Sequence, residues 1–170
     1  AFLSVSENLK GAFTYVDTLN GELIFLTQAQ APLGRLIAVK QGQTLAEGRT
    51  LIEECEMKLE DAIRHGDQLV LFYLKDAASL VRVVGADGKK VCDLPLPSAS
   101  GACTLAMQNG RAIRKSDSLI LEFESFVHSP MLLKLTGDQL TVLYQPNPKT
   151  AEDIEVRQIF TEAPDGERIP

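Results

Sequence analysis

The hydrophobic residues of this chain fall into short runs, separated by polar segments that contain glycine, asparagine or aspartate. The runs are rich in β-branched and aromatic residues, and their length and composition are typical of strands. Nine predicted strands lie at residues 23–26, 35–39, 49–53, 69–74, 80–84, 89–94, 119–123, 131–135 and 139–144. The pattern therefore predicts an all-β protein.

The nine predicted strands form a unit of three that is repeated three times. The repeats begin at residues 23, 69 and 119, with spacings of 46 and 50 residues, near the roughly 40–50 residues of a propeller blade. Turns at Asp87-Gly88 and Gly137-Asp138 suit tight antiparallel hairpins. Short strands near residues 57–59 and 103–106 bring the unit to four strands. We expect a partial β-propeller of about three four-stranded antiparallel blades.

Residues 51–64 allow two interpretations. They contain seven charged residues and have the propensity for an acidic helix. Their apolar positions follow no helical stripe, however, and the repeat requires strands at this place. We favour the last strand of one blade, a loop and the first strand of the next blade, with the charges on a solvated face.

The pattern changes after the third repeat. Residues 146–152 form a linker interrupted by prolines. Residues 153–161 alternate like a half-buried strand, and a turn at Pro164-Asp165-Gly166 leads to the start of a further strand at Arg168-Ile169-Pro170. We assign residues 1–145 to the propeller portion, with repeats near 23–54, 69–94 and 119–144, and residues 153–170 to the first strands of a second domain.

Charge and composition exclude several classes of function. The net charge is −6 and the basic residues are scattered singly, whereas a nucleic-acid binder gathers its lysines and arginines. No apolar run approaches the roughly 20 residues of a membrane helix. We therefore expect neither nucleic acid nor a membrane as a partner. The first residue is not Met, and residues 2–6 resemble a strand, so we expect the chain to be part of a longer protein.

The cysteines and histidines indicate no metal site. Cys55, Cys92 and Cys103 match no metal-ligand spacing and are odd in number, so we expect reduced thiols in a cytoplasmic protein. His65 and His128 lie apart from each other and from any cysteine in the sequence. No metal or cofactor is expected.

Several segments together resemble one family. Residues 155–160 followed by Pro164-Asp165-Gly166-Glu167-Arg168-Ile169-Pro170 are similar to the entry into the hydrolase domain of prolyl oligopeptidases, which are serine peptidases. The matches cover most of the chain in the family's order. The blade segments that carry them are Leu26-Thr27, Ala31-Pro32, Arg35-Leu36, Tyr73-Leu74-Lys75-Asp76-Ala77, Leu94-Pro95-Leu96-Pro97 and Phe123-Glu124-Ser125-Phe126 with Pro130.

Two features depart from the family's pattern. The family has a Trp and a Leu-Ile-Pro-Glu run, whereas this chain has no Trp and carries Leu51-Ile52-Glu53-Glu54 at the corresponding place. The segment between residues 6 and 23 is also shorter. These departures leave the family assignment intact and weaken the expectation of full activity.

The resemblance implies an activity that lies in the parent protein. It implies that residues 153–170 are the first strands of a truncated α/β-hydrolase domain whose body supplies the Ser-Asp-His triad. It also implies hydrolysis of short peptides after Pro, with the propeller restricting access to the active site. The expected partners are short peptide substrates and the remaining blades and hydrolase domain of the same polypeptide. Two alternatives remain open: a non-catalytic interaction scaffold, and an enzyme of the oligopeptidase B type that cleaves after basic residues.

The chain itself carries no recognisable catalytic machinery. No Gly-x-Ser-x-Gly elbow occurs in it, so we assign no catalytic, cofactor-binding or metal-binding residue. Ser125 and His128 are close in sequence, but we interpret them as polar residues of a blade loop because no elbow accompanies them. Glu122 and Glu124 share one face of a strand and are interpreted as a solvated face rather than as an acid–base pair. Asp165 is interpreted as a turn residue.

Overall fold

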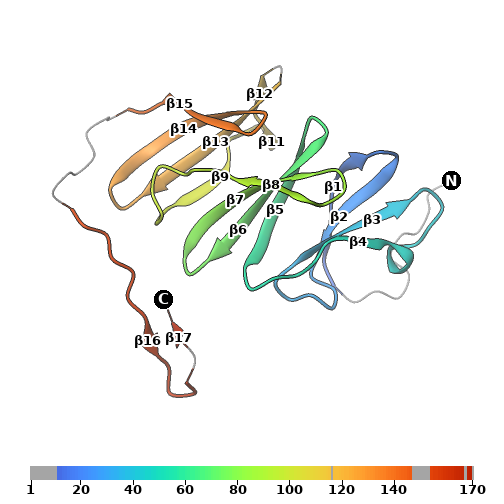
Figure 1. Cartoon of the computed structure of the whole chain (residues 1–170), viewed down its shortest axis with the longest axis horizontal. Coiled ribbons are helices and arrows are strands. Elements are labelled where there is room, and N and C mark those ends of the chain that lie inside the picture. The colour runs from blue at the N-terminus through green and yellow to red at the C-terminus, as the bar shows by residue number, and fades with distance from the viewer. Residues whose placement is uncertain (1–10, 116, 147–153, 167, 170) are drawn as a thin grey trace. The chain divides into compact units, whose positions relative to one another are not determined.

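The computed structural model describes residues 11–115, 117–146, 154–166 and 168–169. Its regular structure is almost entirely β, in three antiparallel sheets of four or five strands and two short two-stranded hairpins (Figure 1). The prediction of an all-β, partial propeller with three blades is thereby confirmed. Within the described residues, none of the helical segments has the length and hydrophobicity needed to span a membrane.

Blade I is a meander in which strands adjacent in sequence are adjacent in the sheet. Ile37 and Val39 bury their side chains against Leu45 of a short 3-10 helix, and Phe13 and Phe25 pack alongside. Full burial of each such side chain stabilises the fold by about 1.5–3 kcal/mol relative to exposure. The elements are β1 (Phe13–Leu19), β2 (Glu22–Thr27), β3 (Arg35–Lys40), η1 (Leu45–Glu47) and β4 (Arg49–Ile52).

Blade II repeats this meander. Residues 69–73 are buried at five consecutive positions, so both faces of the second strand are covered, as the apolar run predicts. The predicted positive φ at Gly88 is present, at 81°. Residues 51–64 form strand, loop and strand, and the helical interpretation is wrong. The strands are β5 (Lys58–His65), β6 (Gln68–Lys75), β7 (Ala78–Gly85) and β8 (Lys90–Asp93).

Blade III has a first strand in two pieces, a feature that the sequence analysis did not predict. β9 (Ala102–Leu105) and β12 (Arg114–Lys115) both pair with the second strand, β13 (Ser118–Ser125). Between them lies a hairpin of β10 (Met107–Gln108) and β11 (Arg111–Ala112). The sheet is completed by β14 (His128–Thr136) and β15 (Gln139–Tyr144).

The predicted C-terminal hairpin is present, although it is shorter than expected. β16 (Thr161–Glu162) pairs with β17 (Arg168–Ile169) across a turn in which the amide of Gly166 donates to the carbonyl of Ala163 at 2.9 Å. The prediction of a strand over residues 153–161 is wrong for residues 154–160, which have no regular structure and are largely exposed. Their alternation is not enough, because a strand also needs a neighbour, and no described strand pairs with them.

The chain divides into two compact units. The first contains blade I and most of blade II, up to Leu74 together with Val81–Leu94. The second contains blade III, the segment Lys75–Leu80 and the residues from Pro95 onwards. The strand predicted at residues 2–6 and most of the linker predicted at 146–152 lie outside the described residues.

Candidate functional site

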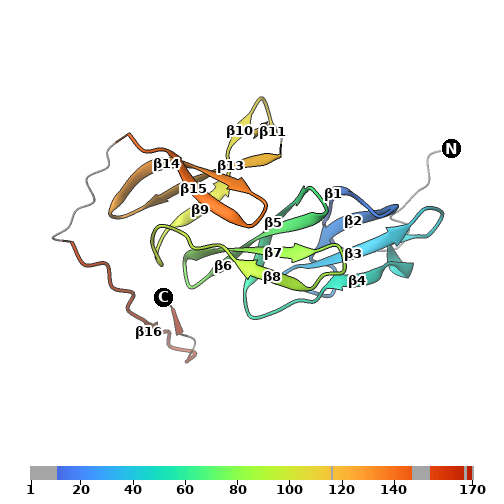
Figure 2. The ribbon, with the colours of Figure 1, turned by 45° about the horizontal axis from the view of Figure 1, so that its top comes forward.

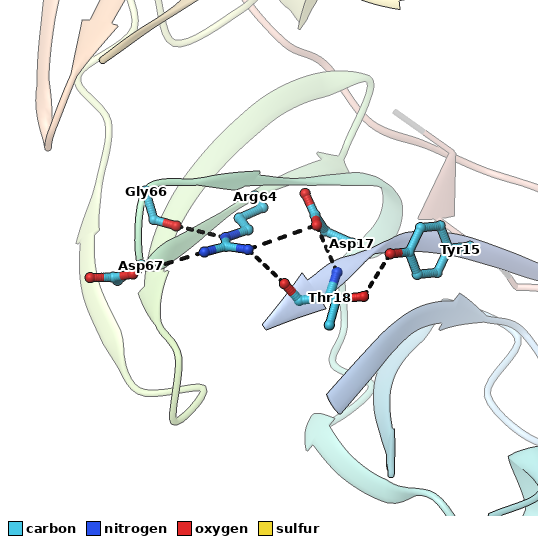
Figure 3. A network of polar contacts seen from close by, with 6 residues as sticks. All are labelled: Tyr15, Asp17, Thr18, Arg64, Gly66 and Asp67. Carbon is cyan, nitrogen blue, oxygen red and sulfur yellow. Dashed lines mark hydrogen bonds and ion pairs between the residues drawn. The ribbon is translucent and has the colours of Figure 1, made fainter. Parts of the chain in front are cut away.

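A network of polar contacts joins the first strands of blades I and II within the first unit (Figure 3). Its centre is Arg64, near the end of β5. The guanidinium donates from Nη1 to the carbonyl oxygen of Thr18 on β1 at 2.7 Å, and from Nε to the carbonyl oxygen of Gly66 at 2.8 Å. These bonds fix the ends of two neighbouring first strands to each other.

Carboxylates surround the same guanidinium. Asp17 Oδ1 lies 3.9 Å from Nη1, and Asp67 Oδ1 lies 4.0 Å from Nη2. Asp67 is almost fully exposed, so its attraction is weakened by solvent, whereas Asp17 and Arg64 keep about a third of their side-chain surface exposed. The hydrogen bonds to carbonyl oxygens are therefore the stronger part of the network, and the ion pairs orient it.

Irregular pairing in both first strands shapes this site. A bulge between Tyr15 and Asp17 shifts the register of β1 against β2, and a bulge between Leu59 and Asp61 does the same for β5 against β6. In each blade the aspartate after the bulge accepts a hydrogen bond from the next amide, from Thr18 at 2.7 Å and from Ala62 at 2.8 Å. Bulges of this kind re-aim side chains.

The two aspartates differ in their environment. Asp61 is exposed on β5, but neighbouring atoms partly desolvate its carboxyl group and raise its pKa above the usual value, and the hydrogen bond from the amide of Ala62 partly counteracts this. On β1, Tyr15 shares a hydrogen bond with the hydroxyl of Thr18 at 2.8 Å and stacks edge-on against Phe25 at 5.7 Å. The phenol of Tyr15 remains half exposed and is available to a ligand. The network can orient and bind polar groups, but it holds no activated nucleophile.

A second polar cluster lies on the face of blade II, and the sequence analysis missed it. Arg82 donates to both carboxylate oxygens of Asp93, at 2.7 and 3.3 Å, and Lys90 binds the same carboxylate at 2.6 Å. The guanidinium lies 5.5 Å from the centre of the Tyr73 ring. The hydrogen bond from Arg82 is the main cause that lowers the pKa of Asp93, whereas burial raises the pKa of Tyr73 to about 12.

Tyr73, Arg82 and Lys90 line a cleft of about 300 Å³ within the first unit, together with residues of β4 and Cys55. The Arg82–Asp93 pair could have been predicted from the turn at Asp87-Gly88. This turn sets the register of β7 and β8, in which Arg82 lies opposite Asp93. Both cations are hydrogen-bonded to Asp93, so we interpret the cluster as a stabilising contact of the blade.

Ser125 and His128 are brought together at the turn between β13 and β14. Ser125 Oγ lies 2.8 Å from His128 Nδ1, and the same oxygen accepts hydrogen bonds from the amides of Val127 at 3.3 Å and His128 at 3.1 Å. The hydroxyl therefore caps the turn. The His128 ring packs edge-on against Phe123, 6.0 Å between centres. No carboxylate among the described residues is hydrogen-bonded to this ring, so the orienting third member of a triad does not accompany the pair.

The other candidate residues take up ordinary positions. Glu122 and Glu124 are both exposed and lie on one face of β13, while Phe123 between them is buried. Cys55, Cys92 and Cys103 form no disulfide within the described residues. Burial raises the pKa of the Cys103 thiol to about 12, so it is protonated and unreactive.

Comparison with known proteins identifies the family of this chain. Residues 1–143 match the family described as prolyl oligopeptidase, N-terminal β-propeller domain. The prolyl endopeptidase of Dictyostelium discoideum is 25% identical over 181 aligned residues, which cover 96% of this chain and 23% of that protein. The chain thus spans about a quarter of the length of this relative.

Solved structures show the same fold at lower identity. One, from a structural and mechanistic analysis of two prolyl endopeptidases, matches with a TM-score of 0.80 at 24% identity, over 96% of this chain and 24% of that one. Prolyl oligopeptidase B from Galerina marginata, bound to a 35-residue substrate, matches with a TM-score of 0.79 at 17% identity, over 98% and 24% of the two chains. The repeated blades agree with the family match, and the chain belongs to the prolyl oligopeptidase family, with residues 1–143 as part of its N-terminal β-propeller domain.

Proposed function

We propose that this chain is the substrate-gating portion of a proline-specific serine oligopeptidase that hydrolyses short peptides after Pro. The family match over residues 1–143 carries the proposal. The relative from Dictyostelium discoideum is named a prolyl endopeptidase, and this chain covers about a quarter of it. We propose that the remaining blades and the hydrolase domain belong to the same polypeptide and supply the catalytic triad.

The role of this portion is to control access and bind peptides. In a closed propeller the first strand of each blade lies nearest the central channel. The network around Arg64 on β1 and β5 would then stiffen the channel wall, and Tyr15 would offer a hydrogen-bonding group to a peptide. We also propose a cytoplasmic location, because three cysteines are an odd number and match no disulfide framework.

The test is hydrolysis by the protein expressed from its complete reading frame. Two chromogenic peptides that differ only in Pro or Arg before the cleaved bond are compared by kcat/KM. We expect a preference for Pro of at least about a hundredfold, because a pocket shaped for one side chain rejects another strongly. Preference for Arg would favour the oligopeptidase B type. Hydrolysis of neither peptide, with no labelling by a fluorophosphonate probe, would favour a binding scaffold.

A further inference from the structure

The first strand of blade III is built differently from those of blades I and II. β1 and β5 are continuous strands of seven and eight residues, each with a one-residue bulge. In blade III the corresponding strand is divided by the hairpin β10–β11, which extends away from the sheet as a separate ribbon (Figure 2).

The hairpin is inserted at a single pairing position, opposite Ile120 of β13. The amide of Ala106 donates to the carbonyl of Ile120 at 3.1 Å, and the amide of Ile120 donates to the carbonyl of Ile113, also at 3.1 Å. In an ordinary antiparallel pair one residue makes both bonds. Here two residues share them, and a bond from the amide of Ile113 to the carbonyl of Ala106 at 2.8 Å closes the base of the hairpin.

The register on both sides of the insertion is undisturbed. Leu105 lies opposite Leu121, and Arg114 lies opposite Leu119. At the tip, Asn109 and Gly110 have φ values of 52° and 72°, which is the chemistry of a type I′ hairpin turn. The insertion is thus a well-formed β-ribbon.

The ribbon and its base carry a concentration of positive charge. Arg111, Arg114 and Lys115 are exposed, and residues 106–115 include no acidic residue, although the chain as a whole has a net charge of −6. None of the ion pairs found among the described residues involves these three side chains. The nearest acidic neighbour in sequence, Asp117, accepts a hydrogen bond from the hydroxyl of Ser118. Arg111 lies on β11 of the hairpin, and Arg114 and Lys115 form β12 at its base, so three cations that were expected to be scattered fall within five residues.

The position of the ribbon in the sheet indicates which part of the propeller the positive charges face. β9 and β12 pair on one side with β13, and no other described strand pairs with them. Their other edge is therefore free. In a closed propeller this edge of the innermost strand borders the central channel, so an insertion in the strand lies at the channel wall.

Resting on the proposed function, we propose that the β10–β11 hairpin, with β12 at its base, is a cationic specificity element that binds the carboxylate side chains of acidic peptide substrates. Arginine pairs with carboxylates through two parallel hydrogen bonds. A narrow channel with low-dielectric walls concentrates the field of such groups and raises the local concentration of ligands of opposite charge. Half-exposed Met107 adds apolar contact beside the charges.

The experiment measures binding of two labelled peptides to the protein expressed from its complete reading frame. The peptides share one Pro-containing sequence and differ in three positions, all Glu or all Gln, and binding is followed by fluorescence anisotropy. We expect the Glu peptide to bind on the order of tenfold more tightly at low salt, with the difference shrinking at high ionic strength. In R111Q/R114Q/K115Q the two affinities should become equal.

Two further variants control for the change in net charge and for loss of folding. K40Q/K75Q/K89Q removes the same net charge from other exposed turns and strand ends and should retain the preference for the Glu peptide. Deletion of residues 107–113, combined with R114Q and K115Q, joins Ala106 to position 114, so that Ala106 can make both bonds with Ile120; this variant should melt cooperatively and lose the preference.

The outcomes are separable from those of the proposed function. A preference that persists in R111Q/R114Q/K115Q, that disappears equally in K40Q/K75Q/K89Q, or that is absent from the unaltered protein would overturn the hairpin proposal. Absence of hydrolysis of any Pro peptide would overturn the proposed function, while the binding comparison would still decide the role of the hairpin.

Discussion

Arg64 of β5 reaches the main chain of a neighbouring blade, donating from Nη1 to the carbonyl oxygen of Thr18 at 2.7 Å across 46 residues of sequence. The acceptor lies on β1, and the same guanidinium binds the carbonyl of Gly66 beside its own strand. One side chain therefore joins the ends of two first strands. Together with the bond from the amide of Leu59 to the carbonyl of Leu33 at 2.7 Å, this directional contact fixes how blades I and II are aligned.

Removing this contact should loosen blades I and II. We expect Arg64→Met to lower the free energy of unfolding by about 1–2 kcal/mol, because two hydrogen bonds to carbonyl oxygens are lost while the aliphatic stem is kept. Arg64→Lys should recover only part of this, since an ammonium cannot reach both carbonyls with the same geometry. Chemical denaturation of the purified protein measures both.

Lys58 provides the matched control for Arg64. It lies on the same strand and pairs with Glu60 at 3.2 Å, but both side chains are nearly half exposed. Lys58→Met should change stability by no more than about 0.5 kcal/mol. Equal losses for the Lys58 and Arg64 variants would mean that the contact to Thr18 contributes nothing specific.

Asp61 should make stability depend on pH in an unusual direction. Partial desolvation raises its pKa in the folded protein above the ordinary 3.8, so the folded state binds its proton more tightly than the unfolded state does. Stability from this residue is greatest below pH 3.8 and falls as pH rises through the folded pKa. Asp61→Asn keeps an acceptor for the amide of Ala62 and should therefore stabilise the protein slightly at neutral pH, because solvent screens this exposed residue, with the gain vanishing in acid.

Asp93 should show the opposite sign. Its pKa is lowered, chiefly by the hydrogen bond from Arg82, so its contribution is complete above pH 3.8 and is lost as pH falls through the folded pKa. Asp93→Asn should destabilise the protein at neutral pH and matter less in acid. Free energies of unfolding measured from pH 3 to 7 should diverge in opposite directions for the two variants; parallel curves would refute the assignment.

Sequence patterns were sufficient for the architecture because each blade is local. Runs such as residues 69–73, buried on both faces, and turns such as Asp87-Gly88 specify a meander without reference to distant residues. The three repeats then fix the fold class. Contacts between side chains and strands far apart in the sequence could not be predicted in this way. Nothing near Arg64 in the sequence indicates Thr18 as its partner.

The divided strand of blade III was missed for a different reason. Its signal was present, since Asn109-Gly110 is a strong hairpin dipeptide. It was overlooked because the hairpin directly follows a strand already expected at residues 103–106. Two-residue strands also carry almost no periodic pattern. The isolated alternation at residues 154–160 misled in the opposite direction, because it occurs without a pairing strand.

Ser125 should be chemically inert. Its hydroxyl oxygen is occupied by two amides of the β13–β14 turn, and its bond to His128 lacks an orienting carboxylate among the described residues. We expect no labelling of Ser125 by a fluorophosphonate probe, and a loss of about 1 kcal/mol of stability in Ser125→Ala because the turn cap is removed. Peptide mapping after labelling is the measurement, and stoichiometric modification of this serine would contradict the prediction.

Gly88 and Gly42 form a matched pair for testing how closely the blades pack. Both occupy turns between the third and fourth strands of their blades, with φ values of 81° and 89°. At Gly42 an added Cβ meets nothing within 4 Å, so Gly42→Ala should cost only the strained backbone, about 1 kcal/mol. At Gly88 the same atom would collide with the carbonyl oxygen of Leu51 on β4, within the first unit. Gly88→Ala should therefore cost roughly 2–4 kcal/mol, the backbone strain plus the displacement of a neighbouring strand. Thermal and chemical unfolding of both variants measure the difference, and equal losses would show that the turn at Gly88 is not held against β4.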